Sequence, residues 1–335
     1  MYDVLVTENI VGEEMEALQR SFDVTFDPQL WKDRAKLLSA IGDYRAIIVR
    51  NQTKVDRGLI AAARNLSVIG RAGVGLDNVD VHAASDHGAV VVWTPEQNSI
   101  SVAELTIGMM ISLARQIPSA DRSVKSGAWE RQKYTGVELF DKTLGIVGLG
   151  RIGFLVATRA RAFGMRIIAN DALISPDSFM VSESGAALVE LDELLSHADV
   201  VSVHIPATPQ TARLFNADRF GRMKRGALFI NTSRGEVVDE SALIAALEQK
   251  QIAGAALDVR ATEPPGASAL SEMENVILTP HIAAFTVEGQ RRVVASVCRD
   301  VAAVLRGESP KYFVNFPKPG KSNLMSEVAH ASDGT

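Results

Sequence analysis

The stretch KTLGIVGLGRIGF, residues 142–154, decides the fold of a large part of this chain, because an apolar strand runs directly into a glycine-rich turn and then a helical pattern. The glycines are Gly148, Gly150 and Gly153. In such a motif the first glycine makes the tight turn, the second leaves room for a phosphate, and the third lets helix and strand pack closely. The helix N-terminus then presents backbone N–H groups to an anion. The stretch therefore predicts a strand, turn and helix that bind a dinucleotide pyrophosphate.

A second apolar strand, expected at 166–170, ends in Asp171, which lies 23 residues after Gly148. An acidic residue at this distance hydrogen-bonds the adenosine ribose in dinucleotide-binding units. Its carboxylate would accept a hydrogen bond from a free 2′-hydroxyl and repel a 2′-phosphate. No arginine follows it directly in the ALI stretch at 172–174. This order favours NAD over NADP, whereas the glycines alone could equally mark a strand-to-helix turn of another α/β protein.

Composition and charge limit the classes of protein to which the chain could belong. Its length of 335 residues predicts two domains, and with 47% hydrophobic residues it can form a core in each. The net charge of −5 and the absence of basic runs argue against nucleic-acid or polybasic membrane partners. The single cysteine, Cys298, lies in a helical pattern and reads as a structural thiol. With neither a signal-like N-terminus nor a long apolar span, we expect a cytoplasmic protein that has no metal site.

Strand and helix patterns alternate along the whole chain, which predicts the α/β class with two doubly wound parallel-sheet domains. The first resembles flavodoxin-type sheets and would bind substrate, and the second is the NAD-binding Rossmann domain, inserted within the first. We expect a discontinuous substrate domain at 1–98 plus 285–316, in which a final helix returns to pack on the first domain. The NAD-binding domain is expected at 99–284, and the polar stretch at 317–335 is expected to be a disordered tail.

Three polar side chains follow different strands of the second domain. Arg234 follows the strand at 227–230, Glu263 comes shortly after the strand at 255–257, and His281 follows the strand at 276–278. The carboxyl ends of parallel strands meet at one edge of a sheet, so these residues can converge. Taken singly, each could be an ordinary surface or loop residue. Together they supply a proton donor, a cation for a carboxylate and a partner for the imidazole, which is what reduction of a keto acid requires.

From Ile69 to Asn315 the chain resembles the D-isomer-specific 2-hydroxy-acid dehydrogenases and, within that family, the catalytic part of the phosphoglycerate dehydrogenases. The matching segments are IGRAGVGLDNVD (69–80), SVAELTIGMM (101–110), KTLGIVGLGRIG (142–153), FGMRIIANDALISP (163–176), NTSRGEVVDE (231–240), GAALDV (254–259), TEPP (262–265) and TPHIAAFT (279–286).

The resemblance implies a role for each polar group. His281 would exchange a proton with the substrate carbonyl, Glu263 would bond to it and favour the imidazolium, and Arg234 would clamp the substrate carboxylate. Asp258 and the backbone at 281–284 would hold the nicotinamide amide. The implied cofactor-binding residues are Gly148, Gly150, Arg151, Ile152, Gly153, Asp171, Ile205, Thr232, Ser233, Asp258 and Ala284. The implied substrate-binding residues are Arg50, Ala72, Gly73, Val74 and Gly75, the last four through backbone N–H groups.

The chain departs from the family pattern at several positions. Arg260 stands where an aromatic or small apolar residue is usual, and Trp93 stands where a small or polar residue is common. After the histidine, Ala283 and Phe285 replace a common glycine and serine. We expect none of these to touch the proposed catalytic trio, although they affect the expected shape of the substrate end.

The substrate is expected to be a 2-hydroxy or 2-keto acid, and basic residues suggest a second anion on it. Arg50 and Lys54, together with Arg71, could bind a distal phosphate or sulfonate, as in 3-phosphoglycerate or sulfolactate. They could instead be solvated loop charges, which leaves a hydroxypyruvate or glyoxylate reductase as an alternative.

Two other functions stay open. An NAD-sensing module like the C-terminal-binding-protein corepressors would share the fold and the trio. A formate dehydrogenase is a weaker rival, since that branch has Gln where this chain has Glu263.

The long helical pattern at 101–115 and the loop through Trp129 resemble the family's dimer-forming arm and predict a homodimer or a dimer of dimers.

Overall fold

A computed structural model describes residues 2–316 of the chain. The predicted disordered tail at 317–335 lies outside the described residues. The described part divides into two compact units, the first made of the residues up to Asn98 together with those from Val287 onward, and the second of Ser99–Thr286. The first unit is therefore discontinuous in sequence.

The sheet of the first unit has five strands, all parallel, in the spatial order β2-β1-β3-β4-β5. This is the order of flavodoxin-type sheets. The strands are β1 (Tyr2–Val6), β2 (Val24–Phe26), β3 (Tyr44–Val49), β4 (Val68–Arg71) and β5 (Val90–Val92).

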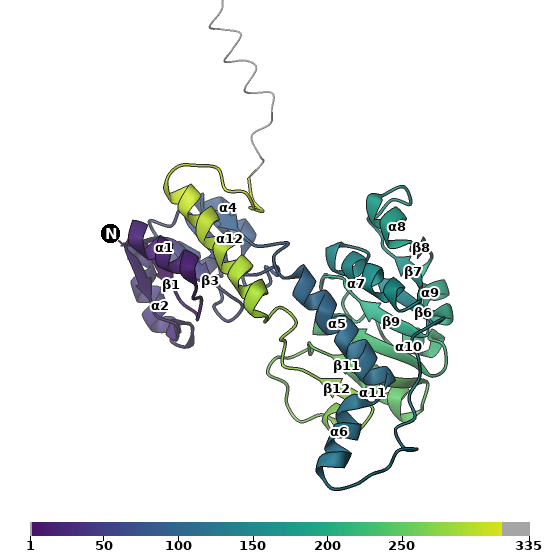
Figure 1. The fold of residues 1–335 in the computed structure, drawn as a ribbon. Coiled ribbons are helices and arrows are strands. Elements are labelled where there is room, and N and C mark those ends of the chain that lie inside the picture. The colour runs from purple at the N-terminus through teal and green to yellow at the C-terminus, as the bar shows by residue number, and fades with distance from the viewer. Residues whose placement is uncertain (1, 317–335) are drawn as a thin grey trace, which may run out of the picture. The chain divides into compact units, whose positions relative to one another are not determined.

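Helices cover both faces of this first sheet. On one face α1 (Glu13–Ser21) packs beside α12 (Val287–Leu305), as Figure 1 shows, and their apolar side chains form one core with the sheet. The opposite face carries a second core beneath three further helices. These are α2 (Arg34–Ala40), α3 (Arg57–Ala62) and α4 (Val81–His87), with short 3-10 turns η1 (Leu30–Lys32) and η2 (Ile41–Asp43).

The sheet of the second unit has seven parallel strands in the order β12-β11-β10-β9-β6-β7-β8. The chain starts in the middle of the sheet at β6, builds outward to β8, and then reverses from β9 to β12, which is the Rossmann order with one added strand. The strands are β6 (Thr143–Val147), β7 (Arg166–Asn170), β8 (Ala187–Leu188), β9 (Val200–Val203), β10 (Ala227–Asn231), β11 (Ile252–Leu257) and β12 (Val276–Leu278).

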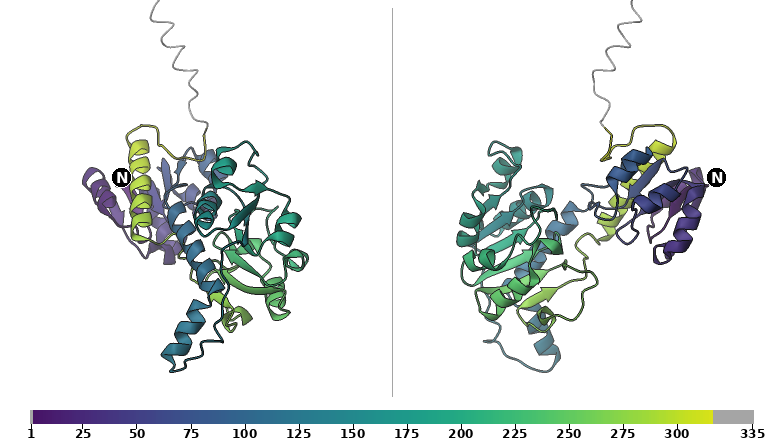
Figure 2. Two further views of the ribbon diagram at one scale, coloured as in Figure 1. Left: turned by 45° about the vertical axis from the view of Figure 1, so that its right-hand side comes forward. Right: turned by 180° about the vertical axis from the view of Figure 1, so that it is seen from behind.

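Helices again cover both faces of this second sheet (Figure 2). One core contains side chains of α5 (Ser99–Ala114) and α7 (Arg151–Ala162), and the other contains side chains of α9, α10 and α11. The remaining elements are α6 (Ile117–Lys125), α8 (Phe179–Ser184), α9 (Leu191–His197), α10 (Ala217–Arg222), α11 (Glu240–Glu248), η3 (Gly235–Val237) and η4 (Ala269–Ser271).

Burial on both faces explains the composition of the strands. Every residue of β6, β9 and β10 is buried, which is why these strands read as continuous apolar runs rather than as alternating patterns. The polar exceptions are Thr143 at the start of β6, Ser202 within β9 and Asn231 at the end of β10. All seven strands run in the same direction, so the residues that follow them lie at one edge.

The predicted fold class is confirmed by these two parallel α/β sheets. The sequence did not predict α6 or the two-residue strand β8. α5 ends because Gln116 adopts a left-handed conformation with φ of 52°, and α6 then starts with a proline in its first turn. Among the described residues no single helix is long and apolar enough to cross a membrane, although α5 and α6, bent by 62° at their junction, pass that test as a pair.

Candidate active site

The glycine turn after β6 has the close approaches that its sequence predicts. Gly148 has φ of 96°, and a Cβ there would come within 2.7 Å of the carbonyl oxygen of His204. A Cβ on Gly153 would come within 2.1 Å of the carbonyl oxygen of Gly148. The protein's own backbone therefore requires glycine at both positions, since helix α7 packs directly on the turn.

Gly150 differs from its two neighbours in the motif. It is the N-cap of α7, it forms no side-chain cap, and a Cβ built on it would meet nothing within 4 Å. The fold thus leaves space in front of the helix N-terminus, where the helix dipole and backbone N–H groups favour an anion. Arg151 and Ile152 form the first turn beside this space, and Ile205 lies against Gly148. The residues fit the pyrophosphate of a dinucleotide.

Asp171 follows β7 and is fastened to the glycine turn. One carboxylate oxygen accepts a hydrogen bond from the backbone N–H of Leu149 at 2.8 Å, and the other accepts from Leu173 at 2.8 Å and Ile174 at 3.2 Å. A carboxylate has about four acceptor sites. The side chain therefore joins two strand ends and keeps acceptor capacity for the ribose hydroxyl predicted from the sequence.

His204 lies beside the same turn and was not singled out from the sequence. Its Nε2 is 2.8 Å from the hydroxyl of Ser202, and its backbone N–H donates to Val147. Burial lowers the pKa of His204 to about 3. The imidazole is neutral at physiological pH, and we assign it a packing role under the glycine turn.

The turn after β10 carries Arg234 and is held by one buried amide. Asn231 accepts hydrogen bonds from the backbone N–H and the hydroxyl of Ser233, at 3.0 and 2.8 Å, and donates to the carbonyl oxygen of Arg234 at 2.8 Å. Thr232 is fixed from α5, because its hydroxyl is 2.9 Å from that of Thr106. Asn231 begins the matching segment 231–240, but the sequence analysis predicted no role for it. The signal that could have identified it is the tendency of an Asn at the end of a strand to hydrogen-bond the backbone of its own turn.

Asp258, at the end of β11, holds the loop that carries His281. Its carboxylate accepts hydrogen bonds from the backbone N–H groups of Ile282 and Ala283, both at 2.8 Å, and from the hydroxyl of Thr279 at 2.5 Å. Its carbonyl oxygen accepts from the backbone N–H of His281 at 2.8 Å. His281 itself has φ of 56°, in the left-handed region. Asp258 thus fixes the histidine, a role added to its predicted contact with the nicotinamide amide.

His281 and Glu263 form a direct pair, with Nδ1 2.7 Å from a carboxylate oxygen. Burial would raise the pKa of Glu263, but hydrogen bonds from His281 and from the backbone N–H of Arg260, with the nearby charge of Arg234, hold it below its usual value. The carboxylate is therefore ionised and can only accept, so Nδ1 carries the proton. Nε2 is then the ring nitrogen that can exchange a proton with a substrate.

The predicted residues of the first unit lie at the carboxyl ends of its strands. Arg50 follows β3, and the segment 72–75 follows β4, where Ala72 donates a backbone hydrogen bond to Val49 at 2.8 Å. The guanidinium of Arg50 donates to the side-chain oxygen of Gln290. Desolvation lowers the pKa of Arg50, and Glu8 opposes this shift.

Glu8 is a buried residue that sequence reasoning missed. It is 2% exposed and follows β1 after one residue. Its carboxylate accepts from the backbone N–H groups of Arg50, Gln52 and Thr53 at 2.8, 3.1 and 3.0 Å. Glu8 therefore shapes the loop that carries Arg50. A single glutamate after a strand carries no signal of such a contact.

Within residues 2–316 no three His, Cys, Asp or Glu side chains are grouped so as to hold a metal ion.

Comparison with known proteins identifies the family. Residues 107–283 match the family described as D-isomer specific 2-hydroxyacid dehydrogenase, NAD binding domain. The chain belongs to this family. Its second unit is therefore a 2-hydroxyacid dehydrogenase NAD-binding domain, in agreement with the glycine turn and Asp171.

Individual relatives agree with this assignment. D-3-phosphoglycerate dehydrogenase of Synechocystis is 46% identical over 95% of this chain and 56% of its own length. The Homo sapiens protein of that name is 47% identical over 84% of this chain and 52% of its own length. The chain thus spans little more than half the length of these relatives. A glyoxylate reductase structure from Paecilomyes thermophila is 32% identical, with a TM-score of 0.83, and covers 93% of this chain and 98% of its own. A D-lactate dehydrogenase from Aquifex aeolicus, complexed with NAD and lactic acid, is 29% identical with a TM-score of 0.83 over 94% and 100%.

The different surroundings of Gly150 and Gly153 give a matched pair of variants. Gly150→Ala places a methyl group in open space, so the melting temperature should stay close to that of the wild type. The Kd for NADH should rise about 10–100-fold, since losing hydrogen bonds to a charged phosphate costs about 1.5–3 kcal/mol. Gly153→Ala should instead lower the free energy of unfolding by about 1–3 kcal/mol, because its methyl group overlaps a backbone oxygen.

Fluorescence titration with NADH and thermal unfolding measure the two effects. Unchanged NADH affinity in Gly150→Ala, with the fold intact, would show that no phosphate binds at this helix end.

Proposed function

We propose that this protein is an NAD-dependent dehydrogenase that transfers a hydride between nicotinamide and a 2-hydroxy or 2-keto acid. The observation that carries the proposal is the bond of 2.7 Å between His281 and Glu263. This pair lies at the carboxyl edge of the same parallel sheet whose β6 opens into the glycine turn. Ligands of open α/β sheets bind at this edge.

Each residue of the trio has a chemical role in this proposal. Bound NADH supplies the hydride in reduction, and NAD accepts it in oxidation. His281 donates the Nε2 proton to the carbonyl oxygen in reduction and takes it back in oxidation. Glu263 remains ionised and stabilises the imidazolium, while Arg234 offers the planar fork that fits a carboxylate.

The remaining site residues stay proposals on the same basis. Gly148, Gly150, Arg151, Ile152 and Gly153 would surround the pyrophosphate. The other proposed cofactor contacts are Asp171, Ile205, Thr232, Ser233, Asp258 and Ala284. The substrate carboxylate would be bound by the backbone of Ala72, Gly73, Val74 and Gly75.

We further propose a substrate with a distal anionic group, such as 3-phosphoglycerate. The support is that several relatives more than 40% identical to this chain are named D-3-phosphoglycerate dehydrogenase. Arg50 supplies a cation whose loop is fixed by Glu8, which favours a bound anion over a freely moving surface charge. The alternative, a hydroxypyruvate or glyoxylate reductase, is supported by the glyoxylate reductase of the same fold.

Replacing His281 with Ala should reduce turnover of the preferred keto acid by about two to four orders of magnitude, as expected for loss of general acid catalysis. The Kd for NADH should change little. The control is His197→Ala, which removes an exposed imidazole at the end of α9 in the same unit. Steady-state NADH oxidation and fluorescence titration measure both quantities.

A parallel fall in NADH affinity would instead assign His281 a structural role. If the wild type turned over no keto acid but bound NADH tightly, the corepressor-like function would be favoured.

Arg50→Ala tests the distal anion. We expect kcat/KM for phosphohydroxypyruvate to fall about 10–100-fold, the effect of losing one charge-assisted hydrogen bond, with much smaller changes for hydroxypyruvate and glyoxylate. Arg57→Ala is the matched control, because it removes an exposed arginine of the same unit that pairs with Asp86. Equal loss on all three substrates would reject a distal-anion role for Arg50.

We propose a homodimer or a dimer of dimers, formed through α6 and the loop that follows it. The support is apolar exposure, since no residue of α6 is buried. Large exposed apolar side chains in this segment are Ile117, Val124, Trp129, Val137 and Phe140.

A reaction that consumes NAD needs a compartment that contains NAD, and we propose that this compartment is the cytoplasm.

Sedimentation equilibrium should give a mass of at least twice the 36.0 kDa of one chain. Trp129→Ser, which removes the most exposed of these side chains at 77% exposure, should weaken the assembly. The matched variant Leu173→Ser changes an exposed residue outside the segment and should leave it unchanged. A wild type that stays monomeric at high concentration would contradict the proposal.

A further inference from the structure

A buried ion pair lies next to the catalytic pair and takes no part in the chemistry described above. Arg260 is 8% exposed, and its guanidinium donates two hydrogen bonds to Glu240, one from Nε at 2.9 Å and one from Nη2 at 2.7 Å. Glu240 also accepts from the backbone N–H of Ala261 at 3.0 Å. One carboxylate thus binds both the side chain of Arg260 and the backbone that follows it.

Glu240 lies at a helix end, from which it holds Arg260 and the backbone of Ala261 in place. It is the first residue of α11, where the helix dipole favours a negative charge, and Asp239 caps the same helix end. The hydrogen bonds from Arg260 lower the pKa of Glu240, although burial opposes them. Glu240 is therefore an ionised anchor that belongs to a helix rather than to a loop.

The pair is connected to the active site through the backbone of Arg260. This backbone N–H donates to one oxygen of Glu263 at 3.1 Å, and the other oxygen of Glu263 binds His281. On the other side, a Cβ on Gly235 would come within 2.0 Å of the carbonyl carbon of Arg260. Gly235 follows Arg234 directly, so the segment at 260–263 touches the loops of all three proposed catalytic residues.

We propose that Glu240 and Arg260 are positioning residues, which hold the segment at 260–263 so that Glu263 meets His281. The inference rests on the proposed function for its catalytic consequence, but the geometry that it predicts exists without substrate. Neither side chain is hydrogen-bonded to the proposed catalytic trio, so the sequence-based expectation that Arg260 does not touch the trio holds for its side chain and is wrong for its backbone. The pair acts through Glu263, because a shift of the backbone at Arg260 moves the carboxylate that orients the imidazole.

A stabilising ion pair alone would behave differently. Breaking a buried pair leaves a charge without its partner and lowers stability wherever the pair lies. A positioning pair also changes catalysis, and it does so only while Glu263 is present. The two explanations therefore differ in how a change at Arg260 combines with a change at Glu263.

The main experiment compares Arg260→Met, Arg260→Lys and Glu240→Gln with the wild type. We expect kcat for keto-acid reduction to fall about 10–100-fold in Arg260→Met, as displacement of a catalytic group by about 1 Å produces. The KM for the keto acid and the Kd for NADH should change less than about threefold. Arg260→Lys should lie in between, since an ammonium keeps the charge but not the fork.

Combining Arg260→Met with Glu263→Gln gives a double-mutant cycle. In the Glu263→Gln background, Arg260→Met should cost almost nothing further in kcat, because the residue through which it acts has lost its charge. If the two losses multiply instead, Arg260 acts independently of Glu263 and the proposal is wrong.

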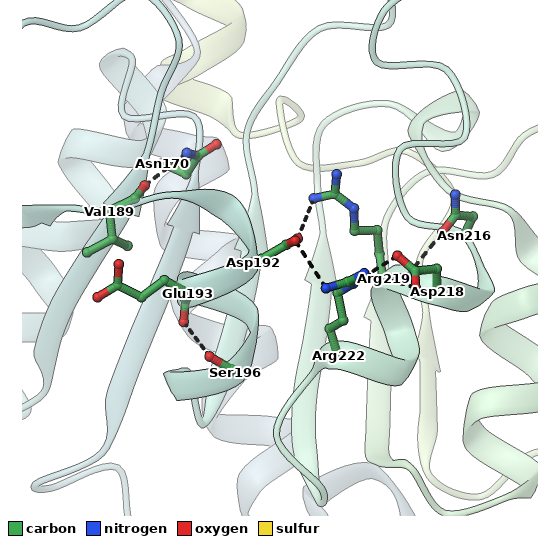
Figure 3. Close-up of polar contacts among 9 residues, drawn as sticks. All are labelled: Asn170, Val189, Asp192, Glu193, Ser196, Asn216, Asp218, Arg219 and Arg222. Carbon is green, nitrogen blue, oxygen red and sulfur yellow. Dashed lines mark hydrogen bonds and ion pairs between the residues drawn. The ribbon is translucent and has the colours of Figure 1, made fainter.

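A control breaks an exposed ion pair on another part of the same unit. Arg222, on α10, pairs with Asp218 at 2.9 Å and with Asp192 of α9 at 3.2 Å (Figure 3). Arg222→Met should leave kcat unchanged. A fall in melting temperature with unchanged kcat in Arg260→Met would assign that pair a purely structural role.

A measurement without substrate separates this inference from the proposed function. The proton between His281 Nδ1 and Glu263 should give a far-downfield imidazole resonance in the proton NMR spectrum, which is absent in His281→Ala. We expect the resonance to be lost or broadened in Arg260→Met and kept in Arg222→Met. If it persists unchanged in Arg260→Met, the positioning role is rejected. An inactive wild type that shows this pattern would overturn the proposed reaction and leave the positioning role supported.

Discussion

The proposed active site depends on the hydrogen bonds that the carboxylate of Asp258 accepts from the loop after β12. His281 stands in the left-handed backbone region, which costs an ordinary residue about 1–2 kcal/mol. That conformation persists because Asp258 binds the backbone N–H groups of Ile282 and Ala283, while its own carbonyl oxygen binds His281. Asp258 is 1% exposed and comes directly after β11, so the loop is fixed to the sheet itself.

The parallel sheet explains how residues far apart in sequence come to lie at one edge. β6 leads into the glycine turn, β10 leads to Arg234, β11 leads to Glu263, and His281 follows β12. All the strands point the same way, so these segments leave the sheet at one edge. Buried apolar strands supply the rigidity, and the polar residues that begin each loop bind one another: Asn231 holds its own turn, and Asp171 binds the glycine turn.

The sequence predicted the parts of this arrangement that depend on local order. Strand positions followed from apolar runs, and Gly148 and Gly153 from the spacing of a known turn, so the fold class and family could be predicted. The pair of Glu240 and Arg260, 20 residues apart, could not. Neither residue type nor spacing indicates that a helix N-terminus and a loop after the next strand will meet. Glu8 was missed for the same reason, since its partners lie more than 40 residues further along the chain. α6 was missed although a proline in its first turn is a helix-start signal.

Charges of alternating sign lead from α11 to the proposed proton donor. Glu240 is negative, Arg260 positive and Glu263 negative, and His281 becomes positive when it takes up a proton at Nε2. The pKa of Glu263 lies below its ordinary value of 4.5, because the hydrogen bonds from His281 and the backbone of Arg260 outweigh the effect of burial. A carboxylate with a lowered pKa stabilises the fold above its ordinary pKa, and that contribution is lost only as the pH falls through the lowered value. Glu263 therefore keeps its charge throughout the neutral range, and a pH dependence of turnover in that range reports a group other than Glu263.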